Sequence, residues 1–196
     1  MVKPLLFSVL AVMIILPLFA QTVPSAEVQI KSALMAAPEG MRDSAKVYGF
    51  SEKGEFITLR EGTNGLICLA DDPNQKGFNA ACYHKDLDPF MARGRELKKE
   101  GKNFKEIFDM REEEVKAGKL KIPHGSSLFV LYGPDEVLNT ATGEVTGASL
   151  RSVVYIPFET SESTGLPLKP AAPGMPWIMD PGTHRAHIMI TPPKGN

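Results

Sequence analysis

The sequence predicts an α+β fold, an antiparallel β-sheet of about six or seven strands with about three helices packed on one face. Three observations predict it. Extended apolar segments are separated by short turns, as in antiparallel sheets. Residues 88–118 change to a helical spacing of apolar residues, with capping residues at the helix ends. The 17 glycines and 16 prolines indicate many turns and argue against a helical bundle.

Residues 1–20 have the three-part layout of a secretory signal peptide. Lys3 gives a positive start, an uncharged apolar run follows, and a small residue, Ala20, closes the segment. We expect cleavage after Ala20, with Ala26 as the alternative. The apolar run of about 16 residues is shorter than the roughly 20 that span a bilayer. Residues 21–196 are therefore expected to form a single exported domain, periplasmic or extracellular, without a transmembrane segment once the leader is removed.

The first helix is predicted over residues 25–37, where Ser25 is the N-cap and Pro38 ends the run. Three strands joined by tight turns are expected next. They cover residues 45–50, 55–60 and 65–70. Consecutive strands with short turns predict an antiparallel meander. A polar loop is then expected from Asp71 to Cys82.

Two further helices are predicted within residues 88–118. In the first, Pro89 stands at the first helical position. The second begins with Asn103 and Glu106 in capping-box spacing. The apolar face of this second helix is expected to comprise Phe104, Ile107, Phe108 and Val115. Its other face, Arg111–Lys116, carries charges of both signs and is interpreted as a solvated surface.

The strand pattern returns in the last third of the chain. Strands are expected at residues 127–132, 150–158, 176–180 and 185–191. The segment 159–176 carries four prolines and is expected to be a long irregular loop.

Cys68 and Cys82 are the only two cysteines. In a chain that enters an oxidising compartment, a pair of cysteines predicts a disulfide bond. Their spacing differs from that of a CxxC redox motif.

The chain carries 22 basic and 23 acidic residues, a net charge of -1, so no nucleic-acid partner is expected. It has no phosphate-binding or dinucleotide-binding glycine motif and no HExxH or GxSxG sequence. His184 and His187 are three residues apart, which on a strand points them to opposite faces. No metal ion or cofactor is therefore expected.

Three longer motifs stand out in the sequence. They are LREGTNGLICLADDP (59–73), ACYHKDLDPFMARGREL (81–97) and PWIMDPGTHRAHIMI (176–190). With these motifs the chain resembles a family of bacterial exported proteins described only as hypothetical, over nearly all of residues 28–191. It departs from the family pattern at Leu66-Ile67, where tryptophan is usual, and at His184, where proline is usual. The resemblance implies export and one coherent domain.

Polar residues at strand ends give the candidate binding site, because loops at such ends usually carry function. We expect Arg60, Glu61 and Asn64 to meet His187 and to bind a small molecule or a cell-envelope component without catalysis. One alternative is a cell-envelope hydrolase in which His187 acts with Glu61 or Asp180. Another is a structural or stress-related exported protein with no small ligand. His187 is expected to bond a backbone carbonyl, or else Glu61, which would raise its pKa.

Overall fold

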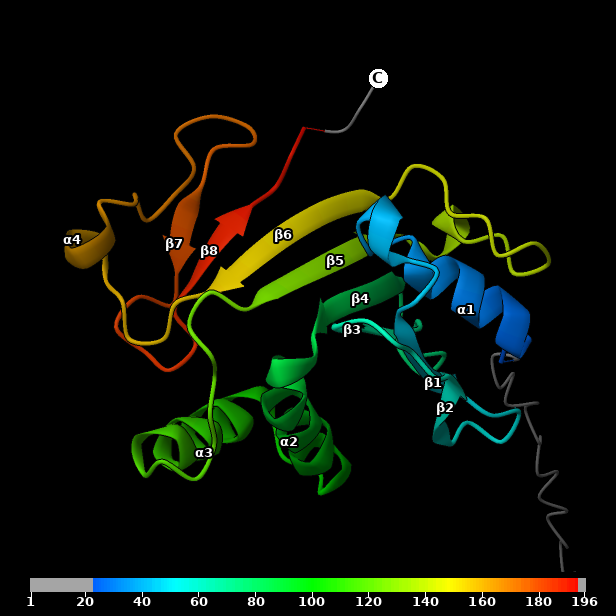
Figure 1. Ribbon diagram of the computed structural model, residues 1–196, viewed down its shortest axis with the longest axis horizontal. Helices are drawn as coiled ribbons and strands as arrows, with labels where there is room; N and C mark the ends of the chain where they lie inside the picture. The colour runs from blue at the N-terminus through cyan, green and yellow to red at the C-terminus, as the bar shows by residue number, and fades with distance from the viewer. Residues whose placement is uncertain (1–22, 194–196) are drawn as a thin grey trace, which may run out of the picture.

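The computed structural model describes residues 23–193, so the predicted leader at residues 1–20 lies outside the described part of the chain. Eight strands form one sheet in the order β2-β1-β3-β4-β5-β6-β8-β7 (Figure 1). The α+β class is confirmed, with eight strands where six or seven were expected and four α-helices where three were expected. Within residues 23–193, no helix has the length and apolar character needed to cross a membrane.

The elements follow one another along the chain with short connections. The strands are β1 (Lys46–Phe50), β2 (Phe56–Arg60), β3 (Leu66–Leu69), β4 (Phe78–His84), β5 (Ser127–Gly133), β6 (Ser149–Tyr155), β7 (Trp177–Met179) and β8 (His187–Ile190). The α-helices are α1 (Ala26–Leu34), α2 (Asp88–Lys99), α3 (Phe104–Lys116) and the short α4 (Ser161–Thr164). Single turns of 3-10 helix cover Glu39–Met41, Lys85–Leu87 and Asp135–Val137.

Helices cover both faces of the sheet, so the expectation that they all pack on one face is wrong (Figure 1). α1 packs in one core cluster with Cys68 and Cys82 of the central strands. α2 lies on the opposite face, where Phe90 belongs to a cluster with Ile67 and Tyr83. Successive residues of a strand point to opposite faces, so strands covered on both faces need apolar residues at nearly every position. The unbroken apolar run of β3 meets that requirement.

α1 and α3 begin where their capping residues predict, whereas α2 begins at Asp88, one residue before the predicted first helical position at Pro89. The side chain of Ser25 accepts a hydrogen bond from the N–H of Val28 at 3.4 Å. Asn103 and Glu106 form the predicted capping box at the start of α3. Pro89 lies in the first turn of α2, where its missing N–H leaves no intrahelical bond unmade.

α3 is buried around Arg111 rather than around Phe104. Only 9% of Arg111 is exposed, whereas 71% of Phe104 is. The other predicted apolar residues are half-buried, namely Ile107, Phe108 and Val115. The interpretation of Arg111–Lys116 as a solvated face is therefore wrong at Arg111. α3 packs against α2 and the segment before β8, a less uniformly apolar surface than the sheet.

β4 begins inside the segment where a polar loop was expected and takes up its last residues, 78–82. Phe78, Ala80 and Cys82 alternate toward the α1 side, with the small residues Asn79 and Ala81 between them. Asparagine and alanine are uncommon in strands, which hid the alternation in the sequence. The strand sets Cys82 directly opposite Cys68 of β3. The predicted disulfide between them is confirmed, with Cα atoms 4.0 Å apart.

β3 does not continue an antiparallel meander, because it pairs in parallel with β1 on the side away from β2. The connection from β2 crosses the start of β1 to reach that side. There the N–H groups of Thr63 and Asn64 donate to the carbonyl of Ser44. A Cβ on Gly62 would lie 2.2 Å from the amide nitrogen of Lys46, so only glycine fits the crossing. β2 is thereby left at an edge of the sheet.

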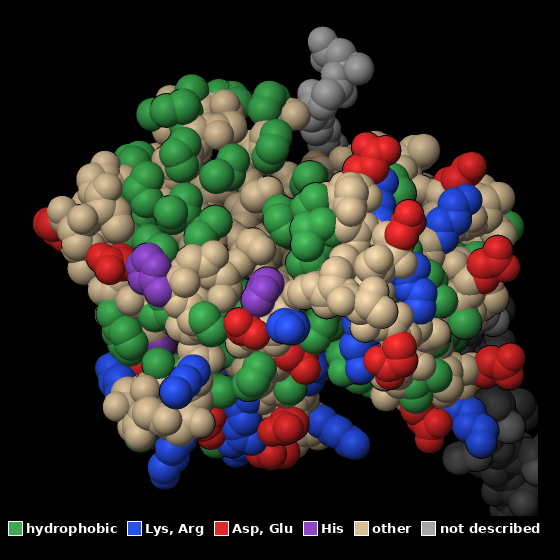
Figure 2. All heavy atoms as spheres, in the orientation of Figure 1, with side chains coloured by type: hydrophobic (Ala, Val, Ile, Leu, Met, Phe, Trp, Pro, Cys, Tyr) green, Lys and Arg blue, Asp and Glu red, His purple; other side chains and the backbone are tan. Residues whose placement is uncertain are grey.

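The face shown in Figure 2 divides into a charged part and an apolar part. Apolar side chains gather toward the β7–β8 end of the sheet. The proline-rich segment 166–176, which precedes β7, carries two exposed apolar residues, Leu168 and Met175. Charged side chains of both signs gather elsewhere on this face.

Candidate functional site

The four residues of the predicted binding site do not come together. Arg60, Glu61 and Asn64 follow or end β2, at one edge of the sheet, whereas His187 begins β8. Five strands separate β2 from β8 in the sheet. Glu61 forms an ion pair with Lys46 at 3.1 Å and lies far from the imidazole. The predicted site, and the pairing of Glu61 with His187, are therefore wrong, because the order of the strands was misassigned.

Arg60 and Asn64 support the crossing connection instead. The Nε of Arg60 donates to the carbonyl of Ala45 at 3.0 Å. The Nδ2 of Asn64 donates to the carbonyl of Met41 at 2.7 Å, and its Oδ1 accepts from the N–H of Leu66. These bonds satisfy backbone groups at the point where the chain passes the start of β1. The role that the structure gives both side chains is to hold this turn.

His187 and Asp180 do lie in one corner of the molecule. His187 is paired with Met179, the residue before Asp180, in the β7–β8 ladder. The Nδ1 of His187 lies 2.6 Å from the carbonyl oxygen of Arg185, which assigns the proton to Nδ1. Burial lowers the pKa of His187, so the ring is neutral at pH 7. The expected bond to a backbone carbonyl is confirmed.

The hydrolase arrangement is not assembled at His187. The carboxylate of Asp180 pairs with the Nε of Arg185 at 3.2 Å rather than with the imidazole. Among residues 23–193, no hydrogen bond joins His187 to a carboxylate or to a serine hydroxyl. Nor does this part of the chain bring together three or more ligating side chains that could hold a metal ion.

A larger polar cluster surrounds this histidine between α3, β6 and the segment that precedes β8. We call it the polar corner. Its members are Arg111, Tyr155, Asp180, His184, Arg185 and His187. The ring of Phe90, from α2, contacts three of them: its centroid lies 5.8 Å from the ring centroids of both Tyr155 and His184 and 4.0 Å from the guanidinium carbon of Arg111.

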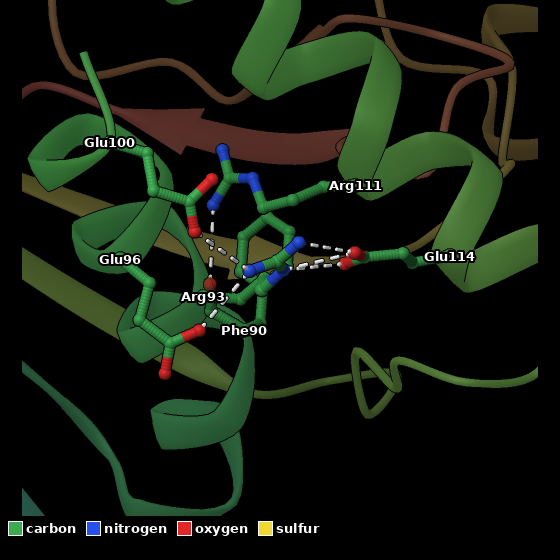
Figure 3. Close-up of polar contacts among 6 residues, drawn as sticks. All are labelled: Phe90, Arg93, Glu96, Glu100, Arg111 and Glu114. Atoms are coloured by element: carbon green, nitrogen blue, oxygen red, sulfur yellow. Dashed lines mark hydrogen bonds and ion pairs between the residues drawn. The ribbon is translucent and has the colours of Figure 1, made fainter. Parts of the chain in front are cut away.

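Arg111 is a buried cation without an acidic partner. Its Nη1 donates to the carbonyl of Phe90 at 3.3 Å, and its Nε has no hydrogen-bond partner (Figure 3). No carboxylate of the described residues forms an ion pair with it. Glu114, three residues further along α3, is held by Arg93, whose Nη2 lies 2.8 Å from it (Figure 3). Burial, together with the charge of Arg185, lowers the pKa of Arg111 to about 10, so it remains charged at pH 7.

His184 is completely buried between two aromatic rings. Phe108 lies 4.7 Å from it and Phe90 lies 5.8 Å from it, both edge-on. Neither ring nitrogen of His184 has a hydrogen-bond partner. Burial, and then the charge of Arg111, lowers its pKa to about 4. The imidazole is therefore neutral at pH 7 and offers one donor and one acceptor that the protein leaves unused.

Tyr155 completes the cluster on the sheet side. Its ring lies 5.7 Å from that of His187. Burial raises the pKa of Tyr155, while the charges of Arg185 and Arg111 act in the opposite direction. The phenol is therefore protonated at pH 7 and is a hydrogen-bond donor.

The charges of the polar corner do not cancel. Arg185 is matched by Asp180, and the two histidines and the tyrosine are neutral, which leaves the charge of Arg111 uncompensated. Such a cluster attracts an anion and repels a metal cation. The arrangement suits the recognition of a carboxylate or phosphate group, because an arginine and neutral donors are the groups that bind these anions.

Reasoning from sequence missed Arg111, Tyr155 and His184 as members of one cluster. One signal was available: Arg111 continues the spacing of Ile107 and Phe108 on the apolar face of a helix, where a charged residue is unusual. No comparable local signal marked Tyr155 or His184, because each becomes part of the cluster only through packing between distant segments.

Comparison with known proteins adds no relative: no family model, no curated protein and no solved structure matches the chain.

Proposed function

We propose that this protein is an exported, non-enzymatic binding domain that takes up a small molecule through an anionic group at the polar corner. The observation that carries the proposal is Arg111, nine-tenths buried and without a carboxylate partner. Buried charges in proteins are normally paired, since an unpaired one loses its hydration without compensation. We therefore infer that Arg111 is retained because it binds an anionic ligand.

An anionic ligand supplies the negative charge that Arg111 lacks as a partner. A carboxylate or phosphate oxygen accepts hydrogen bonds from a guanidinium in a geometry that nothing else in the cluster provides. His184 adds an unused ring N–H of its own. Both groups are held by packing against Phe90 before any ligand arrives, so little side-chain entropy is lost on binding.

A shallow groove between α2 and α3 is lined by none of the six polar-corner residues, but it includes a neighbour of Phe90. Its lining includes Pro89, Arg93, Glu114 and Lys119. Pro89 is adjacent to Phe90, whose carbonyl accepts from Arg111. Because Arg93 is held by glutamates, Lys119 is the groove cation that remains available to a second acidic group of the ligand. The preferred ligand class is therefore a small organic acid or phosphate ester.

A ligand panel tests the proposal. The protein purified after export is titrated with inorganic phosphate, phosphate esters and mono- and dicarboxylates at pH 7, and its melting temperature is measured. A ligand that binds only the native state raises the melting temperature in proportion to its occupancy. We expect Arg111→Gln to abolish the shift. Arg42→Gln is the matched control, because Arg42 also bonds backbone carbonyls but lies at the far end of the sheet.

Two outcomes contradict this function. One is a panel in which no anion shifts the melting temperature of the wild type. The other is a shift that Arg111→Gln and Arg42→Gln leave equally intact, which would place the anion elsewhere.

Export is tested separately from ligand binding. The features that support it are the leader at residues 1–20 and the disulfide between Cys68 and Cys82. We expect the protein in the periplasmic or extracellular fraction, about 20 residues shorter than the translated chain. A full-length chain in the cytoplasm with two free thiols would contradict it.

A further inference from the structure

β2 is an edge strand that exposes both apolar side chains and backbone. It stands at the end of the sheet, with β1 as its only neighbour among the described strands (Figure 1). Phe56 is 40% exposed and Ile57 is 38% exposed. An exposed apolar edge is a template for pairing with another strand, and proteins ordinarily protect it with charges, proline or a covering segment.

The opposite edge of the sheet is protected in that way. At β7, the N–H of Ile178 donates to the carbonyl of Pro167 at 3.0 Å, so the proline-rich segment covers part of that edge. The strand itself has three residues. β2 has five residues and no proline, and the guanidinium of its one charged residue, Arg60, is turned back onto the carbonyl of Ala45. The two edges therefore differ in their readiness to accept a strand.

The pairing of β1 shows which groups of β2 point outward. The carbonyl of Tyr48 accepts from Ala70, beyond β3, so the backbone polar groups of Tyr48 face away from β2. In an antiparallel ladder, directly opposite residues direct these groups either toward each other or both outward. Thr58 is opposite Tyr48, and Phe56 is two residues along the strand. The N–H and C=O groups of Phe56 and Thr58 therefore point to the free side.

From this geometry we infer that β2 pairs with β2 of a second copy of this chain, antiparallel, with Ile57 on the two-fold axis. Phe56 of each copy then lies opposite Thr58 of the other. This register joins the outward N–H and C=O groups of both residues in reciprocal hydrogen bonds. The contact is isologous, as two-fold dimers require, because the same residues serve both copies.

The side chains fit the same register. The two Ile57 residues form a non-hydrogen-bonded pair, the closer type, with Cα atoms about 4.5 Å apart. On that face, a groove lined by Ile57, Leu59 and residues 23–26 and 50–52 lies beside the strand. On the other face, Phe56 stacks on Tyr48 with ring centroids 5.2 Å apart. Pairing removes the two exposed apolar side chains of each copy from water.

Charge complementarity favours a second copy over an unrelated extended peptide. With Ile57 on the axis, the β1–β2 turn of one copy, which carries Lys53, comes to the end of β2 of the other copy, where Glu61 already pairs with Lys46. Lys53 is exposed, and 78% of the Glu61 side chain is exposed. The symmetry repeats this opposite-charge pair at both ends of the contact. Lys53 of each copy thus lies near Glu61 of the other copy, at opposite ends of two identical strands.

Analytical ultracentrifugation of the protein purified after export tests the dimer. We expect a dimer for the wild type and a monomer for Ile57→Lys, which sets two like charges against each other on the axis. Thr58→Pro removes an outward N–H, leaves the β1 ladder bonded, and should also give a monomer. Leu150→Lys is the matched control, because Leu150 is likewise 38% exposed and lies on β6; it should remain a dimer. Circular dichroism shows whether each variant is folded.

A cysteine on the axis tests the register. Cys68 and Cys82 already show that an antiparallel pair with Cα atoms 4.0 Å apart accepts a disulfide. Ile57→Cys should therefore form a disulfide-linked dimer in air, more completely than Lys53→Cys. A wild type that stays monomeric up to high micromolar concentration overturns the inference. So does a dimer that survives both Ile57→Lys and Thr58→Pro, or one that Ile57→Cys fails to cross-link.

Discussion

Gly94 of α2 and Arg111 of α3 occupy facing positions, and the absence of a side chain at one makes room for the other. A Cβ on Gly94 would lie 2.9 Å from the Nη1 of Arg111. Glycine in a helix interior is destabilising by about 1 kcal/mol relative to alanine. Gly94 therefore lowers the stability of α2 but leaves space for the guanidinium of Arg111. The burial of Arg111 thus depends on residues of both α2 and α3.

Gly94→Ala should therefore have different effects in two backgrounds. In the wild type, the added methyl group displaces the guanidinium, and we expect little or no gain in the free energy of unfolding. In Arg111→Met, where the guanidinium is gone, the same substitution should stabilise by about 1 kcal/mol. Urea unfolding of the four proteins of this double-mutant cycle measures the coupling. Additive effects would show that the two residues do not interact.

Arg111→Met should stabilise the unliganded protein. Methionine keeps a long side chain over Phe90 but removes a buried charge that no carboxylate compensates. The loss of the cation–π contact and of the bond to the Phe90 carbonyl offsets part of this effect. We expect a net gain of about 1 kcal/mol in the free energy of unfolding at pH 7. A loss of more than about 1 kcal/mol would mean that the cation is needed for folding rather than for a ligand.

His184 should make the fold sensitive to acid between about pH 6.5 and pH 4. Its pKa is lowered to about 4 in the folded state, whereas the unfolded chain binds the proton near its ordinary value of 6.5. Stability is therefore unaffected by this group above pH 6.5 and is lost as the pH falls toward 4. The shift corresponds to ~3 kcal/mol, because each pKa unit is worth about 1.4 kcal/mol.

The effect of His184 is isolated by comparing variants at each pH. His184→Leu should lose less stability between pH 7 and pH 4 than the wild type does. His124→Leu is the control, since 64% of the His124 side chain is exposed. Asp71, whose pKa burial raises to about 6, changes stability in the opposite direction as the pH falls, and this contribution is common to all three proteins. Parallel pH profiles for His184→Leu and the wild type would contradict the prediction.

The disulfide should be protected from reductant in the folded protein. Cys68 and Cys82 are both fully buried in the core beneath α1. We expect alkylation without reductant to add no mass, and dithiothreitol to act only when denaturant is present. Replacing both cysteines by alanine should lower the free energy of unfolding by ~2–4 kcal/mol. Two labelled cysteines in the untreated protein would contradict the assignment.

Phe158 should be replaceable by glycine with a gain in stability. It has φ 66, a left-handed conformation that a bulky residue rarely adopts, and its side chain is 41% exposed. Phe158→Gly relieves the strain, and we expect a gain of about 1 kcal/mol in the free energy of unfolding. Phe158→Ala is the control, because it removes the ring but keeps the strained Cβ. Equal effects of the two substitutions would assign the change to the ring.

Local features of the fold were predictable from the sequence. Ser25, Asn103 and Glu106 place helix starts through bonds between residues three positions apart, a spacing that is visible in the sequence. The disulfide was predictable because the chain has two cysteines and a sequence that predicts an export leader. The strand order was not. It depends on a crossing that Gly62 permits, and nothing in a local pattern distinguishes a turn that reverses a strand from one that carries it past its neighbour.

The candidate site was less predictable than the fold. His187 and Asp180 were identified and do lie in one corner, because they flank the same β7–β8 connection. The residue on which the proposed function depends, Arg111, lies on a different element and shares no motif with them. In the sequence, an arginine within a charged stretch gives no sign of whether it is buried or exposed. That becomes clear only when the helix that packs against it is known.

The strand order also governs how the sheet can be assembled from a chain delivered N-terminus first. Strands β1–β4 come from residues 46–84 and strands β5–β8 from residues 127–190, and the two halves meet at the single boundary between β4 and β5. Each new strand pairs with an unpaired edge strand of the growing sheet, and β7 and β8 add together as a hairpin. No strand must be threaded between two that are already joined. The chain can therefore build its sheet outward while its later residues are still arriving.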